Sequence, residues 1–216
     1  GEDLPINTWY MKRFAGLSED GLSLWYYTDK ETNEEKTTTT YSTGDFYLCG
    51  DPNPDLYGGF GTSITFHGFD LSTQFSYLVG GLTYDYGYAG MMGNPTATSV
   101  GNRWHKDVLK AWSPENPSST IPRWHFNDLN TTGSSDRFLI DGSYLNLQNI
   151  QVGYTLPDSW TSHLKIKNLR LYFVCDNVYY WSKRKGLDPR RSISGVGTSG
   201  KIAPFRTYSG GISLQF

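Results

Sequence analysis

The chain has 216 residues, a formal net charge of −2 and a mean hydropathy of −0.51. Its Lys and Arg residues are scattered, which argues against a nucleic-acid partner, and no run of about 18 apolar residues predicts a transmembrane helix. The 16 Tyr, 11 Phe, 7 Trp and 24 Gly favour strands and turns over helices. Two cysteines, Cys49 and Cys175, are too few for a disulfide framework, and the sequence does not show whether they pair.

The first predicted strand covers residues 6–17, and the next two, 57–66 and 69–80, are the clearest pattern in the chain. In the stretch FGTSITFHGFDLSTQFSYLVG, apolar residues alternate with polar ones on both sides of His67-Gly68. Alternation with a period of two across a tight turn predicts an antiparallel hairpin with one apolar face.

A short helix is predicted over residues 99–112, where apolar residues recur at helical spacing. It interrupts an otherwise β-type sequence. The next strand, 138–156, changes phase along its length, which predicts a β-bulge near Asn149. Residues 165–181 and 205–216 alternate again and complete a set of six predicted strands.

The connections between the predicted strands alternate in length. Short connections are predicted at His67-Gly68 and 157–164, and long ones at 18–56, 81–137 and 183–204. In an up-and-down meander this order places all long loops at one end and all short turns at the other, as in outer-membrane barrels. A secreted, soluble carbohydrate-binding β-sandwich also alternates in this way and stays open as the alternative.

Alternation divides the strand residues between two faces, of which one suits an apolar medium. In a membrane barrel that medium is lipid, and the predicted lipid-facing residues are Leu71, Phe75, Val79, Leu169, Leu171, Phe173, Ile212, Leu214 and Phe216. The residues predicted to face inward are Ser72, Gln74, Ser76, Arg170, Tyr172 and Asp176. Tyrosines near the strand ends, which suit aromatic girdles at the membrane interfaces, are Tyr57, Tyr77, Tyr154 and Tyr180.

The sequence offers few candidates for chemistry. Its acidic residues single out no catalytic pair, and its His and Asp residues match no zinc spacing, so no enzyme activity, metal or cofactor is predicted. The segment 128–136, DLNTTGSSD, is rich in oxygen ligands but departs from an EF-hand, which favours a plain loop. Trp104, Trp112 and Trp124 are candidates for stacking on sugar rings, although packing inside a folded loop explains them equally well.

Five ordered motifs carry a resemblance to a known family. They are GDPNPDLYGGFGTS (50–63), WSPENPSSTIPRW (112–124), SSDRFLIDGSYLNLQNIQVGYTLP (134–157), LRLYFVCDNVYYWSKRKGLDP (169–189) and RTYSGGISLQF (206–216). Together they resemble the C-terminal portion of SusC-like, TonB-dependent outer-membrane transporters. In the first motif, the Asp, Asn and Pro residues of GDPNPD are also expected to form a rigid turn that leads into the strand.

The resemblance implies an all-β fold, in which residues 1–216 form the last six antiparallel strands of a transmembrane barrel of about 22 strands. It implies long extracellular loops and a location in the outer membrane of a Gram-negative bacterium. The implied partners are the remainder of the barrel with its plug, a SusD-like surface lipoprotein, the TonB complex and outer-membrane lipid. The implied substrate is a glycan oligosaccharide or a peptide. The plug and the earlier strands are not recognised in this chain.

Overall fold

The computed structural model describes residues 4–96, 103–128, 130–131, 133–161, 166–184, 186–191, 195–197 and 204–216. The chain divides into two compact units. Unit 1 comprises Gly1–Asn53, Gly81–Asp141 and Arg191–Lys201, and unit 2 comprises Pro54–Gly80, Gly142–Arg190 and Ile202–Phe216. Among the described residues, no helix combines the length and the apolar character needed to cross a membrane.

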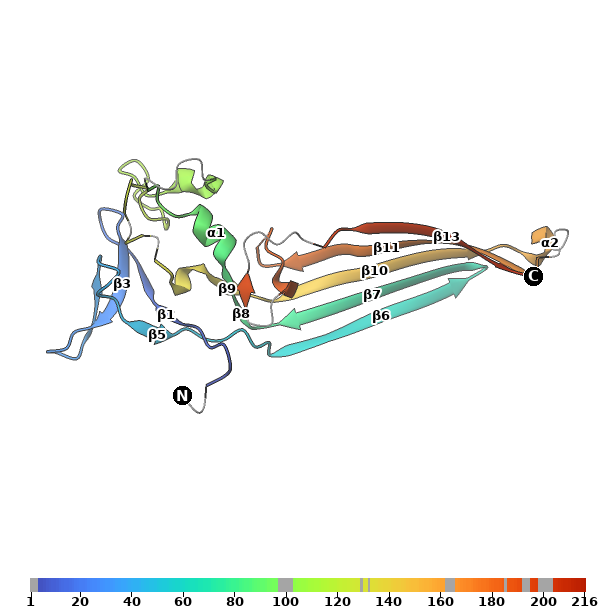
Figure 1. The fold of residues 1–216 in the computed structure, drawn as a ribbon, viewed down its shortest axis with the longest axis horizontal. Helices are drawn as coiled ribbons and strands as arrows, with labels where there is room; N and C mark the ends of the chain where they lie inside the picture. Colours follow the sequence, from blue (N-terminus) through green and yellow to red (C-terminus); the bar gives the residue numbers. More distant parts are fainter. Residues whose placement is uncertain are drawn as a thin grey trace. The chain divides into compact units, whose positions relative to one another are not determined.

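Unit 2 is built on one antiparallel sheet of long strands (Figure 1). Its strands are β6 (Leu56–Phe66), β7 (Phe69–Val79), β10 (Tyr144–Thr155), β11 (Asn168–Ser182) and β13 (Thr207–Gln215). Their order across the sheet, β6-β7-β10-β11-β13, follows the chain, so the sheet is the predicted up-and-down meander. The all-β, antiparallel prediction is confirmed.

The predicted hairpin is present with a two-residue turn. His67 and Gly68 both have positive φ, 46° and 85°, as a type I′ turn requires, and Phe66 pairs directly with Phe69. The GDPNPD turn also forms as expected, because the backbone amide of Asn53 donates to Oδ1 of Asp51 at 2.8 Å.

The predicted bulge lies in β10. The register of β10 shifts between Leu147 and Asn149 against both of its neighbours, which explains why the apolar phase changes there. On the facing part of β11, Asn177 adopts a left-handed φ of 52°. The bulge keeps the apolar side chains on one face along the whole strand.

Residues 6–17 do not join this sheet, which corrects the predicted count of six strands to five. The segment forms β1 (Tyr10–Lys12) and β2 (Phe14–Leu17), and these strands pair with partners inside unit 1. β1 pairs with β5 (Phe46–Leu48), and β2 pairs with β3 (Ser23–Thr28), which also pairs with β4 (Glu35–Thr38). The segment is interrupted at Arg13 and β2 carries a register shift between Phe14 and Gly16, so it forms two short strands instead of one long strand.

The remainder of unit 1 packs around a small core of Met11, Tyr84, Met92 and Phe138. Beside it lies a third small sheet of β8 (Leu82–Asp85), β9 (Leu139–Asp141) and β12 (Val196–Gly197). The short helices within the described residues are α1 (Tyr86–Met91), η1 (Lys106–Lys110), η2 (Asp136–Phe138), α2 (Asp158–Thr161) and η4 (Pro189–Arg191).

The short helix predicted over residues 99–112 is confirmed only in part. Only the 3-10 helix η1 forms there, and residues 99–102 lie outside the described residues. His105 is extended, with ψ of 145°, and its backbone amide donates to the carbonyl of Met91 instead of starting a helix earlier. The α-helix of this region is α1, capped by the Asp85 carboxylate, which accepts from the amide of Tyr88.

Candidate functional site: two faces of one sheet

Strand register assigns every side chain of the unit 2 sheet to one of two faces. Leu71 pairs with Val152, which pairs with Phe173, so these three side chains share a face. We call this the apolar face; it carries Phe60, Ile64, Phe66, Phe69, Leu71, Phe75, Val79, Ile150, Val152, Leu169, Leu171, Phe173, Ile212 and Leu214. The eight predicted lipid-facing residues that lie in these strands are all among them. Phe216, the ninth, follows the last paired residue and is exposed.

The side chains of the apolar face are largely exposed. Phe173 is 49% exposed and Ile212 is 65% exposed. Among the described residues of unit 2, Cys175 is the one buried hydrophobic residue. The described residues of unit 2 form one sheet and no second sheet to face it, which is what a β-sandwich would need. A contiguous apolar surface of this kind marks contact with a membrane or a partner.

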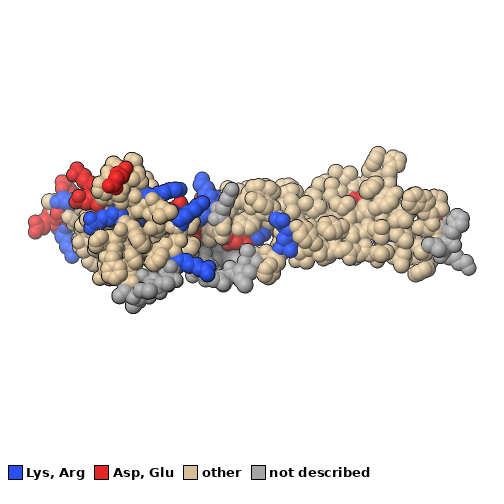
Figure 2. All heavy atoms as spheres, turned by 90° about the horizontal axis from the view of Figure 1, so that it is seen from above, with Lys and Arg blue, Asp and Glu red and all other residues tan. Residues whose placement is uncertain are grey.

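The opposite face, which we call the polar face, carries every charged residue of the five strands. These strands contain Asp70, Arg170 and Asp176 and no other Asp, Glu, Lys or Arg. Figure 2 shows the consequence, since charged side chains gather over unit 1 and are sparse over the long strands in view. The uncharged polar residues of this face include Ser63, Ser72, Gln74, Ser76, Asn146, Asn149, Gln151, Thr207, Ser209 and Ser213.

Asp70 and Arg170 join three strands on the polar face. Arg170 donates from Nε to Oδ1 of Asp70 at 2.9 Å and from Nη2 to Oδ2 at 2.5 Å, a bidentate pair. The two side chains cross β10 at Gly153, which pairs with Asp70 on one side and with Tyr172 on the other. A Cβ at Gly153 would lie 2.5 Å from Arg170 Nη2 and closer still to Asp70 Oδ1, so any larger residue there would displace one of the two side chains.

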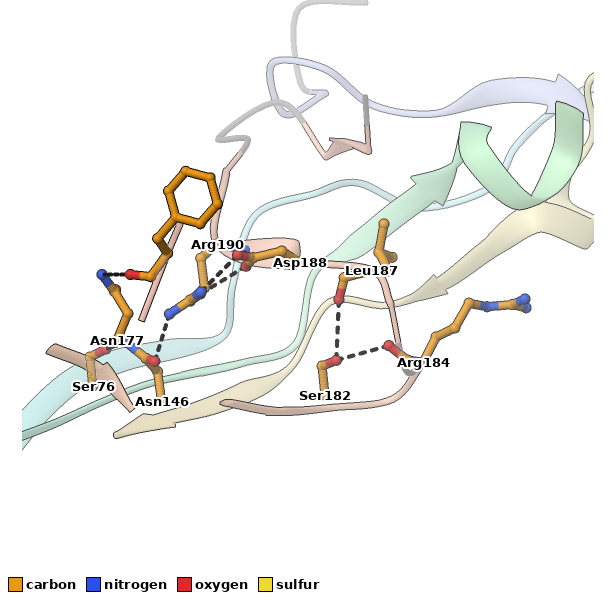
Figure 3. A network of polar contacts seen from close by, with 9 residues as sticks. Ser76, Asn146, Asn177, Ser182, Arg184, Leu187, Asp188 and Arg190 are labelled. Atoms are coloured by element: carbon orange, nitrogen blue, oxygen red, sulfur yellow. Dashed lines mark hydrogen bonds and ion pairs between the residues drawn. The ribbon is translucent and has the colours of Figure 1, made fainter. Parts of the chain in front are cut away.

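A second polar network lies where β10 begins and β11 ends, at the paired residues Tyr144 and Ser182 (Figure 3). Arg190 donates from Nε and Nη2 to the two carboxylate oxygens of Asp188 at 2.8 and 2.7 Å, and from Nη1 to Oδ1 of Asn146 at 2.6 Å. Its guanidinium also lies over the ring of Tyr180, 4.6 Å from the centroid. The hydrogen bonds that Arg190 donates to Asp188 raise the pKa of Arg190, so the residue stays cationic while it holds the loop on the polar face.

The four tyrosines predicted as interfacial girdles divide between the faces. Tyr77 and Tyr154 lie on the apolar face. Tyr57 and Tyr180 lie on the polar face, so the prediction that all four tyrosines share the apolar surface is wrong for these two. Trp181 shares the apolar face with Tyr77, because both pair with the same residue of β10. Position along the strand suggested a girdle, but parity, which the sequence already contains, decides the face.

Two of the three candidate tryptophans come together. The rings of Trp104 and Trp124 meet edge to face, with centroids 5.5 Å apart and an interplanar angle of 86°. They are 37% and 42% exposed, and Nε1 of Trp104 donates to the carbonyl of Gly93. Trp112 is instead packed so closely over Gly21 that no Cβ would fit there. Trp112 therefore packs inside the folded loop.

Unit 1 holds a buried cation in a shell of backbone carbonyls. Nζ of Lys12 donates to the carbonyls of Tyr41 and Gly44, both at 2.6 Å, and to that of Ser42 at 3.3 Å. Its ammonium also lies over the ring of Phe46, 5.0 Å from the centroid. Burial lowers the pKa of Lys12. The arrangement fixes the loop that follows β4 and uses all three donors of the ammonium group.

No cluster of His, Cys, Asp and Glu with the spacing of a metal site occurs within the residues that the structure describes. Both cysteines are free thiols, with Cys175 buried in the sheet. Burial raises the pKa of the Cys49 thiol in unit 1.

Known proteins resemble this chain over nearly its whole length, although no family model matches it. TonB-dependent receptor P3 of Formosa agariphila is 30% identical over 212 residues, which cover 94% of this chain and 20% of that protein. TonB-dependent receptor SusC of Bacteroides thetaiotaomicron is 27% identical over 182 residues, 82% of this chain and 17% of SusC. The chain thus spans about a fifth of the length of these relatives.

Solved structures share the fold. The RagAB peptide transporter aligns with a TM-score of 0.77 and 26% identity over 97% of this chain and 23% of the matched chain. The RagAB peptide importer in its closed-closed state aligns with a TM-score of 0.78 and 25% identity over 99% of this chain and 24% of the matched chain. By sequence and by fold, the chain is a segment homologous to the SusC-like TonB-dependent receptors, β-barrel proteins of the outer membrane.

Proposed function

We propose that this chain is part of an outer-membrane importer that takes up a nutrient through a TonB-dependent barrel. The observation that carries the proposal is the division of the unit 2 sheet into a bare apolar face and a polar face that holds all its charges. A transmembrane barrel has this division, because lipid covers the outer surface and the inner surface meets water or protein.

In this arrangement the apolar face contacts the hydrocarbon of the bilayer. The proposed lipid-facing residues are Leu71, Phe75, Val79, Leu169, Leu171, Phe173, Ile212, Leu214 and Phe216. The His67-Gly68 turn and the connection that contains α2 lie on the periplasmic side, whereas the long connections from β7 to β10 and from β11 to β13 lie outside the cell.

The remainder of the receptor is the first proposed partner. β6 and β13 are the edges of the sheet and have no further neighbour among the described strands. In lipid, each unpaired backbone group costs several kcal/mol, so additional strands must continue the sheet until it closes. The matched relatives are about five times as long as this chain, which is enough for those strands, a plug and a segment that contacts the TonB complex.

A SusD-like surface lipoprotein is the proposed lid over the long extracellular connections. The likeness to SusC and to the RagAB assembly supports this partner. The proposed substrate is a glycan oligosaccharide, because the partly exposed rings of Trp104 and Trp124 lie together and offer aromatic surface that suits the apolar C–H side of sugar rings. A peptide is the second candidate, because the RagAB structures that share this fold are those of a peptide transporter. The role requires no catalytic step.

The experiment that tests the proposal combines two measurements on the intact receptor. Mass spectrometry of the receptor purified from outer membranes should show a bound oligosaccharide, and energised cells should take up that compound only while the receptor gene is intact. A bound peptide would select the second substrate class. Equal uptake by cells with and without the receptor would refute the import function.

A further inference from the structure

Asp176 carries the one charge in the five strands that the described residues do not neutralise. Asp70 and Arg170 pair with each other, whereas Asp176 forms no ion pair within the described part of the chain. Its Oδ1 accepts a hydrogen bond from Nδ2 of Asn149 at 2.7 Å. An asparagine amide is neutral, so this contact orients the carboxylate and leaves its negative charge in place.

The neighbours of Asp176 on the polar face are uncharged. Its row across the sheet consists of Gln74, Asn149, Asp176 and Thr207. Arg190 lies further along the same face but is held by Asp188 and Asn146. The bulge fixes this geometry, since the register shift lies beside Asn149 and the next residue of β11, Asn177, has a positive φ of 52°.

The side chains that surround Asp176 on the polar face are short, uncharged or laid along the sheet. The Asp70–Arg170 pair lies flat over Gly153, and the Tyr172 hydroxyl lies over Gly211, so the longest side chains of this region follow the sheet instead of standing on it. One row of side chains lies between the Asp70–Arg170 pair and Asp176. It carries uncharged side chains such as Ser72 and Ser209.

We infer that Asp176 forms an ion pair with a lysine or arginine of a segment of the same receptor that lies outside these 216 residues and packs on the polar face. Charge complementarity gives the chemistry of the partner, and the length of the relatives, of which this chain covers about a fifth, provides the segment. The inference rests on the barrel arrangement proposed above. An enclosed carboxylate without a counter-charge is costly, and a hydrogen-bonded cation offsets that cost.

Four substitutions in the full-length receptor test the pairing through its thermal unfolding temperature in outer-membrane extracts. Asp176→Asn keeps an oxygen that accepts from Asn149 and removes only the charge, which would orphan the partner cation. We expect Asp176→Asn to lower the unfolding temperature, Asp176→Lys to lower it further and Asp176→Glu to retain the wild-type value. Asp158→Asn, in the exposed turn of α2, is the matched charge-removal control and should change nothing.

A photoreactive residue at position 176 of the full-length receptor identifies the partner directly. The expected cross-link joins position 176 to a peptide that contains lysine or arginine and lies outside the 216 residues. A cross-link confined to these residues, or no cross-link at all, contradicts the inference. Equal unfolding temperatures for wild type, Asp176→Asn and Asp176→Lys would likewise show that the carboxylate meets only water. Uptake by the same variants is measured separately, so a failed pairing is distinguishable from a failed import function.

Discussion

Asp70 and Arg170 lie 100 residues apart in the sequence and are joined by two hydrogen bonds across the full width of β10. Their side chains pass over Gly153, whose missing side chain makes the crossing possible. The pair therefore couples the register of β7, β10 and β11 on the polar face. It also places both charges of a neutral pair away from the apolar face.

The first prediction concerns this crossing. Gly153→Ala places a methyl group within 2.5 Å of Arg170 Nη2 and closer still to the Asp70 carboxylate, so one of them must move. We expect a loss of about 1–3 kcal/mol of stability, the usual cost of overpacking. The temperature at which the folded receptor loses its heat-modifiable mobility in gels measures this loss. Gly210→Ala is the control, because its Cβ would meet nothing closer than the Tyr172 carbonyl at 3.7 Å.

The second prediction separates the two faces. An arginine at Phe173 would point from the apolar face into lipid, at a cost of about 2–4 kcal/mol near the midplane of the bilayer. Gln74→Arg, on the polar face, should leave assembly nearly unchanged. The amount of folded receptor in outer-membrane fractions provides the measurement. If both variants assemble equally well, lipid is not the medium that covers the apolar face.

The third prediction concerns the buried ammonium of unit 1. Lys12→Met keeps the length of the side chain but leaves the carbonyls of Tyr41 and Gly44 without their donor. Each unpaired carbonyl costs about 1–3 kcal/mol, so the loop over residues 41–44 should exchange its amide hydrogens faster. Lys36→Met, which removes a partly exposed ion pair with Asp29, is the comparison and should affect stability less. Unchanged exchange in the Lys12→Met variant would show that the carbonyl shell does not hold the loop.

The fourth prediction concerns substrate contact. Trp124→Ala and Trp104→Ala remove exposed rings, and either change should weaken substrate binding about tenfold, which corresponds to about 1.4 kcal/mol. Trp112→Ala should instead reduce the yield of folded receptor, because this ring packs over Gly21. Calorimetric titration of the purified receptor with the co-purified compound gives the affinities. Wild-type affinity in both exposed-ring variants would remove the pair from the substrate site.

The fifth prediction is a pH dependence near β3 and β4. The hydrogen bond from Lys36 and the backbone amides of Glu31 and Thr32 lower the pKa of Asp29 from 3.8 to about 2. A carboxyl whose pKa is lowered by folding contributes stability that is present above pH 3.8 and is lost as the pH falls through about 2.

Hydrogen exchange of residues 29–36, corrected for the intrinsic rate at each pH, measures this contribution. Protection in the wild type should decline between about pH 4 and pH 2, whereas Lys36→Met should show a weaker decline because the main cause of the shift is gone. The same decline in both proteins would mean that another group titrates.

The local features of the sheet could be predicted because their signals lie within a few residues. The alternation around His67-Gly68 specified a hairpin, and the change of phase near Asn149 specified a bulge, since period and turn chemistry act on adjacent residues. The same alternation assigned Leu71 and Phe173 to one face and Asp176 to the other, as the register confirms.

Other features were decided by contacts between distant parts of the chain. Alternation alone could not show that residues 6–17 pair inside unit 1, that Arg170 reaches Asp70 across β10, or that Trp104 meets Trp124 while Trp112 packs over Gly21. Each depends on which segments become neighbours, and that choice follows from register, packing volume and charge over the folded chain. A periodic pattern determines which way a side chain points, and only the tertiary structure determines what it meets.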